Sequence, residues 1–259
     1  MLIAITRGVS PAIARCELTH VRRTAIDVEL ACAQLEAYEA ALASCGATIH
    51  RLATEPDLPD AVFVEDTAVV LDECAIITRP GAASRRPETV AVAKALTPYR
   101  KLLQIEPPGT LDGGDVLHVA GRMFVGRSTR TNQSGIEQLR ELVARYGITL
   151  ETVDISGCLH LQSAATPVAR DALLVNPAWV DRAALAGLKT IDIDPAEADA
   201  ANALYLADAA HGDTVLYQPQ FPRTLKRLQQ AGLHVVLVDM SELGKAEGAL
   251  TCCALVFRA

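Results

Sequence analysis

The sequence predicts an α/β fold in which five repeated units form a ring, as the blades of a propeller do. The first observation behind this prediction is that apolar residues with helical periodicity recur in five places, each followed by a short β-rich run. The second is that the centres of these units lie about 40 to 55 residues apart, a spacing typical of propellers and arrays. That spacing favours a closed ring over an open sheet.

Each unit is expected to contain one helix, a β-rich run after it and a longer stretch with the pattern of two strands. The helical segments cover 30–44, 89–99, 135–146, 182–188 and 223–230. The β-rich runs cover 47–52, 101–106, 149–155, 189–193 and 234–239. The two-strand stretches cover 62–78, 115–126, 163–175, 203–217, and 250–257 continued by 2–6.

The last unit is complete only if the two ends of the chain pair, because the run at 250–257 has no second strand unless 2–6 supplies it. Pairing of the ends would close the ring. A doubly wound α/β sheet is the alternative, since its strands and helices also alternate, but its Gly-x-Gly-x-x-Gly phosphate motif is missing. With no linker or low-complexity tract, residues 1–259 are expected to form one domain.

Composition and charge exclude several classes of protein. A formal net charge of −7 without a basic stripe argues against a nucleic-acid partner and is compatible with a cationic small-molecule substrate. No apolar run is long enough to span a membrane and the first residues lack a basic leader, so we expect a cytoplasmic protein with no membrane partner. The seven cysteines have no framework spacing, which indicates a reducing compartment.

One long segment, 8–27, has no clear periodicity and contains Pro11 and a charged cluster at 20–23. Structureless loops of this length in compact domains are usually functional or mobile. We therefore expect this segment to be a lid over the active site.

Three segments carry the residue types of covalent catalysis. Cys252 lies where a turn of small residues leads into the C-terminal apolar run, although an unpaired cysteine is more often simply buried. Asp112 precedes a Gly-Gly pair at the start of a strand, where glycine permits close backbone approach, with an ordinary turn as the alternative. His160 follows the third β-rich run. A thiolate nucleophile, a proton-transferring histidine and an orienting carboxylate make up a catalytic set.

Other charged residues indicate the kind of substrate. Glu65 and Asp66 interrupt an apolar stretch that predicts a strand, where carboxylates are costly unless a cation neutralises them, and Asp60 precedes them. Arg85 and Arg130 are suited to clamp a carboxylate through forked hydrogen bonds. If the ring brings these residues to one cavity, the set fits a small molecule with a guanidinium at one end and an amino-acid group at the other.

Six motifs together resemble the dimethylarginine dimethylaminohydrolase family of the guanidine-modifying (pentein) superfamily. They follow the family order from near residue 56 to the C-terminus: 63–66 (FVED), 77–86 (ITRPGAASRR), 111–115 (LDGGD), 130–132 (RTN), 159–161 (LHL) and 250–253 (LTCC). The resemblance implies a five-bladed α/β propeller of ββαβ units with pseudo-fivefold symmetry. It also implies hydrolysis of dimethylarginine or monomethylarginine to citrulline and an amine, without a metal or organic cofactor, and a possible homodimer.

The resemblance also implies a role for each matched residue. Cys252 is similar to the family's nucleophile, His160 to its general acid and base, and Asp112 to the carboxylate that orients the histidine. The implied substrate contacts are Leu18 in the lid, Asp60, Phe63, Glu65, Asp66, Arg85, Arg130 and the backbone carbonyl of Ala246. Cys253 is expected to pack inside the protein, because neighbouring strand residues point to opposite faces.

Several alternatives stay open at this point. Arginine deiminases and other guanidine hydrolases share the chemistry, but they typically carry a helical insertion for which this chain has no room. A non-catalytic protein that binds arginine analogues would keep the carboxylates without turnover. A structural zinc site is disfavoured, because Cys158 and His160 lack the paired-cysteine spacing that such sites need; zinc on Cys252 and His160 would act as an inhibitor.

Overall fold

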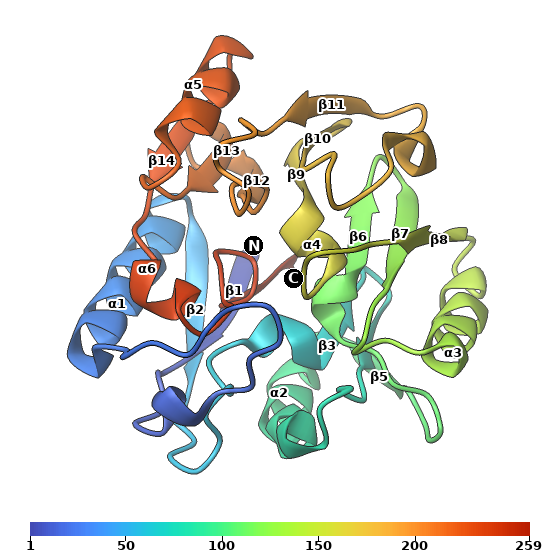
Figure 1. Ribbon diagram of the computed structural model, residues 1–259. Coiled ribbons are helices and arrows are strands. Elements are labelled where there is room, and N and C mark those ends of the chain that lie inside the picture. Colours follow the sequence, from blue (N-terminus) through green and yellow to red (C-terminus); the bar gives the residue numbers. More distant parts are fainter.

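The computed structural model describes residues 1–259 and contains five three-stranded sheets arranged around a common centre (Figure 1). Each sheet joins strands in the same order, with a middle strand that pairs with both neighbours. The strands are β3 (Ala68–Val70), β4 (Cys74–Ile77) and β5 (Lys101–Gln104); β6 (Val116–Val119), β7 (Arg122–Arg127) and β8 (Leu150–Asp154); β9 (Ala165–Ala169), β10 (Ala172–Val175) and β11 (Lys189–Asp192); β12 (Leu204–Ala209), β13 (Gly212–Tyr217) and β14 (Val235–Leu237); and β15 (Leu255–Arg258), β1 (Leu2–Arg7) and β2 (Ala47–Leu52).

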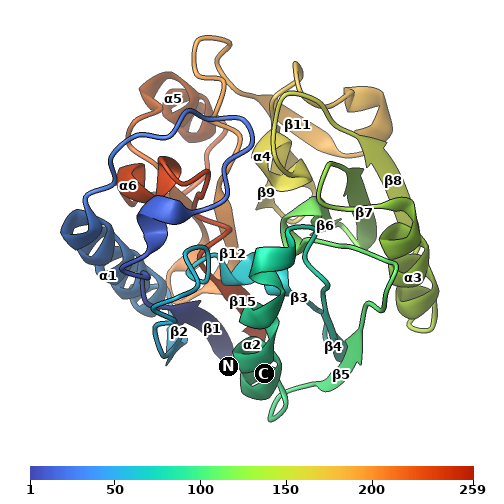
Figure 2. The same ribbon diagram turned by 60° about the horizontal axis from the view of Figure 1, so that its bottom comes forward.

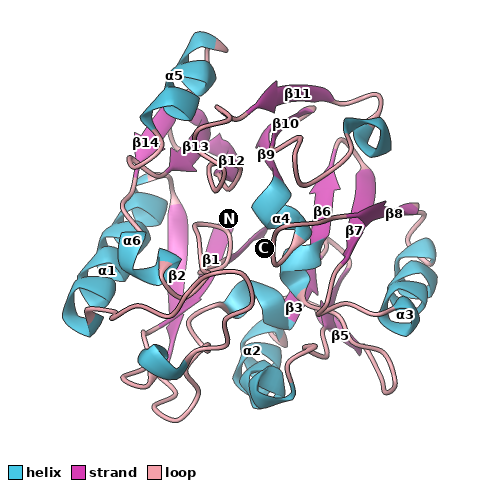
Figure 3. Ribbon diagram, in the orientation of Figure 1, coloured by secondary structure: helices cyan, strands magenta, loops and turns pink.

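In every sheet the first pair of strands is antiparallel and the second pair is parallel. A parallel partner needs a crossover connection, which is why a helix stands between the second and third strand of most units. These helices lie on the outside of the ring (Figure 3). They are α1 (Val28–Ser44), α2 (Thr89–Leu96), α3 (Gln133–Ala144) and α5 (Pro222–Gln230), with the 3₁₀ helix η5 (Arg182–Leu185) in the third unit.

The two chain ends close the ring, as the sequence predicted. Strand β15 pairs antiparallel with β1, placing Leu2 opposite Arg258 and Ile5 opposite Leu255. The backbone N–H of Ala259 donates to the carbonyl of Met1 at 2.9 Å. Figure 2 shows the two termini side by side at the edge of this sheet. The five ββαβ units and the propeller expected from the sequence are confirmed.

Two predictions about local structure were wrong. The segment 182–188 forms only the short 3₁₀ helix η5, because Gly187 adopts a φ of 88° and stops so short a segment from becoming a stable α-helix. Glu65 and Asp66 lie in the 3₁₀ helix η2 (Val64–Thr67), not in a strand. The bent backbone of η2 allows the Asp66 carboxylate to accept a hydrogen bond from the N–H of Gly114, so the buried charge has a polar partner.

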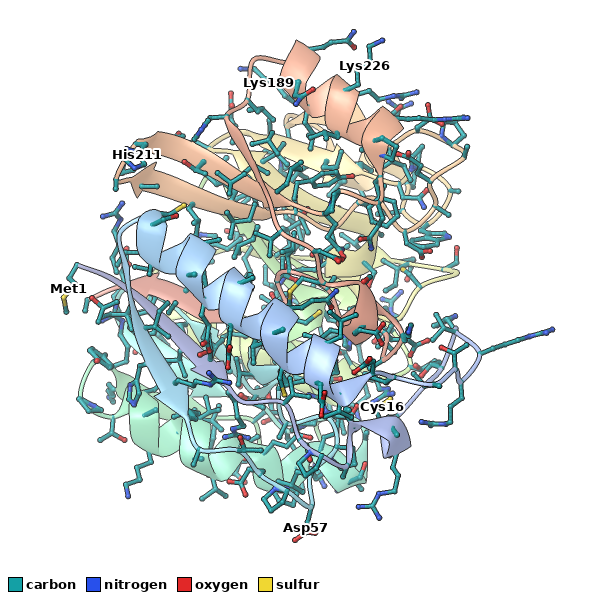
Figure 4. The ribbon with its side chains drawn as sticks, turned by 90° about the vertical axis from the view of Figure 1, so that its left-hand side faces the viewer. Met1, Cys16, Asp57, Lys189, His211 and Lys226 are labelled. Atoms are coloured by element: carbon teal, nitrogen blue, oxygen red, sulfur yellow. The ribbon has the colours of Figure 1, made fainter.

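The core is divided into five hydrophobic clusters, and each lies between neighbouring units. One joins Ile5 and Leu255 of the closing sheet to Val64 and Ala75 of the next unit. Another joins α1 to the sheet of β12 and β13, and Figure 4 shows α1 running from the lid segment near Cys16 to the β12–β13 hairpin beside His211. Because the units are held by contacts with their neighbours, no single centre carries the fold.

The innermost strands β3, β6, β9, β12 and β15 contribute residues to the lining of a cavity of about 540 Å³. Most of its lining residues are apolar, and Glu65 is one of the few charged groups. None of the helices is both long and apolar enough to cross a membrane.

Substitution of Phe257 tests how much the closing sheet contributes to the free energy of unfolding. Its buried ring packs edge-on against Tyr99, with ring centroids 5.4 Å apart, and lies 5.3 Å from the guanidinium carbon of Arg100. Phe257→Ala should therefore lower the free energy of unfolding by about 3–5 kcal/mol. Urea unfolding followed by circular dichroism measures this change, with exposed Val90→Ala on α2 as the control. Equal midpoints for the two variants would contradict the prediction.

Candidate functional site

The candidate catalytic residues occupy equivalent positions in the repeated units. Asp66 lies in η2 before β3, and Asp112 directly precedes η4 (Gly113–Asp115), which leads into β6. His160 precedes α4 (Leu161–Ala164) and β9, and Cys252 lies in the turn before β15. Because each inner strand starts on the same face of the ring, the residues before these strands converge there (Figure 1).

Asp112 orients His160 through a buried contact. The Nε2 atom of His160 lies 3.0 Å from Oδ2 of Asp112, and both side chains are almost completely buried. The second oxygen of Asp112 accepts a hydrogen bond from the N–H of Gly81 at 2.8 Å. With both carboxylate oxygens occupied, Asp112 is fixed, and Nδ1 is the nitrogen of His160 left for other partners.

Asp66 lies on the other side of the imidazole. Its Oδ1 is 3.7 Å from Nδ1 of His160, and its Oδ2 pairs with Arg85 at 2.6 Å. Burial alone would lower the pKa of His160, but the charge of Asp66 and the hydrogen bond that Nε2 donates to Asp112 outweigh it and raise the pKa to about 10. His160 is therefore a cation that can donate a proton at neutral pH.

Arg85 is placed differently from a substrate clamp. Its guanidinium is buried and donates to the carboxylates of Asp66 and Glu88 and to the carbonyls of Asp60 and Phe63. These acceptors use nearly all of its donors, so Arg85 holds η2 and the segment before it in place. Arg130 makes one side-chain hydrogen bond, from Nη2 to the hydroxyl of Thr19 at 3.2 Å, and keeps its other donors available.

The two adjacent cysteines differ in their surroundings. Cys253 is fully buried in a hydrophobic cluster, whereas Cys252 is only partly buried. Burial and the charges of Glu65 and Asp66 raise the pKa of the Cys252 thiol, so the thiol is protonated in this state. The expected difference between the cysteines is present, although both lie in a turn and not on a strand.

Three polar side chains tie the turn of Cys252 to the rest of the site. Thr251 donates from its hydroxyl to Glu65 at 2.8 Å and accepts from the amide of Asn202 at 3.0 Å. Asn202 also donates to the carbonyl of Gln162, two residues after His160. The N–H of Glu65 donates to the carbonyl of Cys252 at 3.1 Å. Hydrogen bonds thus hold the turn of the nucleophile candidate to two other units directly and, through Asn202, to a third.

Asn202 is a residue that the sequence analysis missed. It stands before β12, where the fourth unit has the equivalent of Asp66, Asp112, His160 and Cys252, and it is buried. An alignment of the five repeats by their inner strands would have pointed to it. Asp115 was noted only as part of a motif, yet its carboxylate accepts from the N–H of Leu161 and from the hydroxyls of Ser128 and Thr131. Burial raises its pKa to about 6.

Glu65 lies on the boundary between the catalytic face and the axial cavity of about 540 Å³. Glu65, Gly113, Gln162 and Thr251 all border that cavity, and each is within two positions of a candidate catalytic residue. Burial and the charge of Asp66 raise the pKa of Glu65 to about 8. Glu65 therefore links the axial cavity to the neighbourhood of the candidate catalytic residues.

The predicted lid segment contacts several of the expected substrate-binding residues. Asp60, which is buried, accepts the N–H of Glu17 with both carboxylate oxygens at 3.2 Å. Leu18 is half-buried against a hydrophobic cluster that includes Phe63 and Ala246. These expected substrate contacts therefore lie together beneath or within the lid.

Phe63 and Gly248 show why the segment before Cys252 is shaped as it is. A side chain at Gly248 would place its Cβ about 2.1 Å from the Phe63 ring, so only glycine allows the backbone to lie on that ring. Ala246, two residues earlier, is buried. A second cavity of about 520 Å³ opens beside this segment, and Leu159, Gly248 and the lid residues His20 and Val21 are among its lining residues.

Asp66, Asp112 and His160 also have the spacing of a metal-ligand set, with their ligand atoms within 4.8 Å of one another. The individual atoms have other partners, however. Oδ2 of Asp66 is bound to Arg85, and Nε2 of His160 is bound to Asp112. A buried guanidinium this close also disfavours a divalent cation, so the contacts fit proton transfer better than metal binding.

Comparisons with known proteins find relatives over nearly the whole chain. The chain is 36% identical over 256 residues to a dimethylarginine dimethylaminohydrolase of Streptomyces coelicolor, covering 98% of this chain and 96% of that protein. It is 33% identical to the enzyme of that name from Pseudomonas aeruginosa, covering 89% and 90% of the two chains. A solved structure of the Pseudomonas aeruginosa protein, a variant complexed with citrulline, aligns over 98% of both chains with a TM-score of 0.92 and 31% identity. No family model matches the chain.

The ring of five ββαβ units, with a cysteine, a histidine and carboxylates converging on one face, defines a pentein-fold protein of the guanidine-modifying class. Within that class, the sequence identity to the two dimethylarginine dimethylaminohydrolases and the share of each chain that aligns establish the family. The chain belongs to the dimethylarginine dimethylaminohydrolase family.

The raised pKa of Glu65 makes stability depend on pH. The pKa is about 8 in the folded protein against 4.5 for an ordinary glutamate, so the folded state binds the proton more tightly. The resulting stabilisation is complete below pH 4.5 and is lost as the pH rises to about 8. Glu65→Gln should remove this part of the pH dependence.

Denaturant unfolding at several pH values between 4.5 and 8 measures the effect for both proteins. The stability of wild type minus that of Glu65→Gln should decrease steadily as the pH rises. Taking this difference cancels the contribution of Asp115, which also has a raised pKa. A difference that is constant with pH would mean that Glu65 is ionised throughout.

Proposed function

We propose that this protein hydrolyses Nω,Nω-dimethyl-L-arginine, and Nω-monomethyl-L-arginine, to L-citrulline and dimethylamine or methylamine. The observation that carries the proposal is the buried Asp112–His160–Asp66 arrangement beside the partly buried thiol of Cys252. The enzyme names of the relatives and the citrulline complex of the Pseudomonas aeruginosa protein support it. The amine product distinguishes this reaction from that of an arginine deiminase.

The carboxylates explain how a guanidinium would bind and activate the nucleophile. Burial, together with the charges of Glu65 and Asp66, raises the pKa of the Cys252 thiol and keeps the thiol protonated. A guanidinium bound between these groups would neutralise their charge and favour the thiolate. The substrate would then generate its own nucleophile, and the resting thiol would be protected from unwanted reactions.

The chemical steps follow from the orientation of His160. The Cys252 thiolate attacks the guanidinium carbon to give a tetrahedral adduct, and Nδ1 of His160 donates its proton to the departing amine. The remaining S-alkylthiouronium is attacked by water, whose proton returns to His160. Collapse of that adduct releases citrulline and the thiolate. Asp112 holds Nε2 and stabilises the imidazolium in both halves of the reaction.

The amino-acid end of the substrate is assigned to the residues around the lid. Asp60 would hold the α-amino group and Arg130 the α-carboxylate, because both are buried at the lid and Arg130 keeps unused donors. Leu18 covers the substrate, Phe63 supports the adjoining backbone, and the carbonyl of Ala246 accepts from the guanidinium end. Arg85 serves the site by orienting Asp66.

The single domain over 1–259, the cytoplasmic location and the homodimer stay predictions. The same holds for a reaction that needs no metal, for which activity in the presence of a chelator is the direct test.

The assignment of the reaction is tested with dimethylarginine, monomethylarginine and arginine in parallel, measuring citrulline and free amine. The methylated substrates should be turned over faster than arginine. Exclusive turnover of arginine would place the protein with the deiminases. Binding of all three without product would indicate a non-catalytic binding protein.

The choice of nucleophile is tested in the same assay. Cys252→Ser should lose turnover while it still binds dimethylarginine in calorimetry, because a hydroxyl is a far weaker nucleophile than a thiolate. Cys253→Ala is the matched control and should stay active, since Cys253 is fully buried. An active Cys252→Ser together with an inactive Cys253→Ala would reverse the assignment.

The orienting role of Asp112 predicts a large loss of kcat in Asp112→Asn. Removing the carboxylate leaves His160 without the partner of Nε2, and comparable changes in other enzymes lower kcat by about 1,000- to 10,000-fold. KM should change little. Asp72→Asn, at an exposed turn, is the control. A loss below tenfold would show that His160 does not depend on Asp112.

A further inference from the structure

Glu247 makes an unusual set of contacts with the lid. Its carboxylate accepts hydrogen bonds from three successive backbone N–H groups, those of Thr19, His20 and Val21. The distances are 2.8 Å to Thr19 and 2.7 Å to Val21. Successive backbone N–H groups that point the same way form an anion-binding nest, and here the bound anion is a side chain of the same protein.

The backbone at Glu247 indicates that this position is not set by packing alone. Its φ is 58°, in the left-handed region that glycine and asparagine adopt most readily. Glu247 also directly follows Ala246 and precedes Gly248, whose backbone lies on the Phe63 ring. A glutamate in a conformation unfavourable to it needs a compensating interaction, and the contacts with the lid provide one.

Other residues also hold this part of the lid. Asp60 accepts the N–H of Glu17, the Glu17 carboxylate accepts the hydroxyl of Ser84 at 2.6 Å, and Arg130 donates to Thr19. Asp60, Ser84 and Arg130 belong to the first two units, whereas Glu247 belongs to the segment before β15. The lid therefore has two anchors: one is formed by Asp60, Ser84 and Arg130, and the other by Glu247.

The two anchors differ in one respect. Asp60 and Arg130 are the groups that the proposed function assigns to the substrate's α-amino and α-carboxylate groups, so a bound substrate competes for their contacts with Glu17 and Thr19. Glu247 has no such second task. When substrate takes over Asp60 and Arg130, the contacts of Glu247 are the ones that keep residues 19–21 in place.

We propose that Glu247 is a positioning residue that latches the lid in its closed position and so holds Leu18 over the substrate. It acts on the reaction only through the lid. The latch rests on contacts within the protein, whereas its effect on kinetics rests on the proposed function.

Hydrogen exchange measured by mass spectrometry on the unliganded protein tests the latch directly. Glu247→Ala should speed the exchange of the peptide covering 17–23 about tenfold or more, because three amides lose their acceptor. Trypsin cleavage after Arg22 and Arg23 should accelerate in parallel. Glu29→Ala removes an equal charge at an exposed site of α1 and should leave both unchanged. Exchange equal to wild type in Glu247→Ala would overturn the proposal.

Glu247→Gly separates the latch from a general role in stability. Glycine adopts a φ of 58° without strain, so this variant should unfold at the same or a higher urea concentration than wild type. Its lid should nevertheless exchange as fast as that of Glu247→Ala, and Glu247→Asp should restore part of the protection. A lid as protected as in wild type, or faster exchange over the whole chain, would make Glu247 merely structural.

In the kinetic assay, the latch predicts that loss of Glu247 changes KM and leaves kcat nearly constant. Glu247→Ala should raise KM for dimethylarginine about tenfold, since each substrate must pay for ordering the lid, while kcat stays within about twofold. Equal losses in kcat and kcat/KM would contradict a role limited to the lid. If the protein did not hydrolyse methylarginines, the kinetic assay would give no product. Hydrogen exchange on the unliganded protein would still decide whether the latch exists.

Discussion

The antiparallel pairing of β15 with β1 is the constraint on which the rest of the structure depends. It joins two segments more than 240 residues apart in sequence and completes the fifth sheet. Each hydrophobic cluster lies between neighbouring units, so an open ring would leave the first and last units with exposed apolar faces. The same pairing sets the turn of Cys252 beside η2, where the N–H of Glu65 binds the carbonyl of Cys252.

The packing of neighbouring units also explains how buried charges are tolerated. Asp66, Arg85, Asp112 and His160 come from different segments, and each would be costly to bury alone. Brought together, Arg85 neutralises Asp66, and Asp112 holds His160. The Cys252 thiol lies near the same carboxylates, and burial together with the charges of Glu65 and Asp66 raises its pKa. A guanidinium bound there, as the proposed function requires, would favour the thiolate, so the arrangement combines structural and chemical roles.

The lid is also held by contacts from segments that are distant in sequence. Its backbone N–H groups are bound by Asp60, which precedes β3, and by Glu247, which precedes β15. Asp60 and Arg130 hold the lid at Glu17 and Thr19, while Glu247 connects it to the segment that carries Ala246 and Gly248. The lid and the turn of Cys252 are therefore linked through one short stretch of chain.

The sequence by itself determined the five repeats, the closure of the ring and the set of reactive residues, because periodicity and motifs are local properties of the chain. Tertiary structure alone decided the orientations. The contacts of the folded chain decided that Arg85 faces Asp66 and that η2 is a 3₁₀ helix where an apolar pattern predicted a strand. Asn202 and Glu247 join segments that are distant in sequence. Hydrogen bonds and ion pairs act over a few ångströms in space, and only folding brings those groups within that distance.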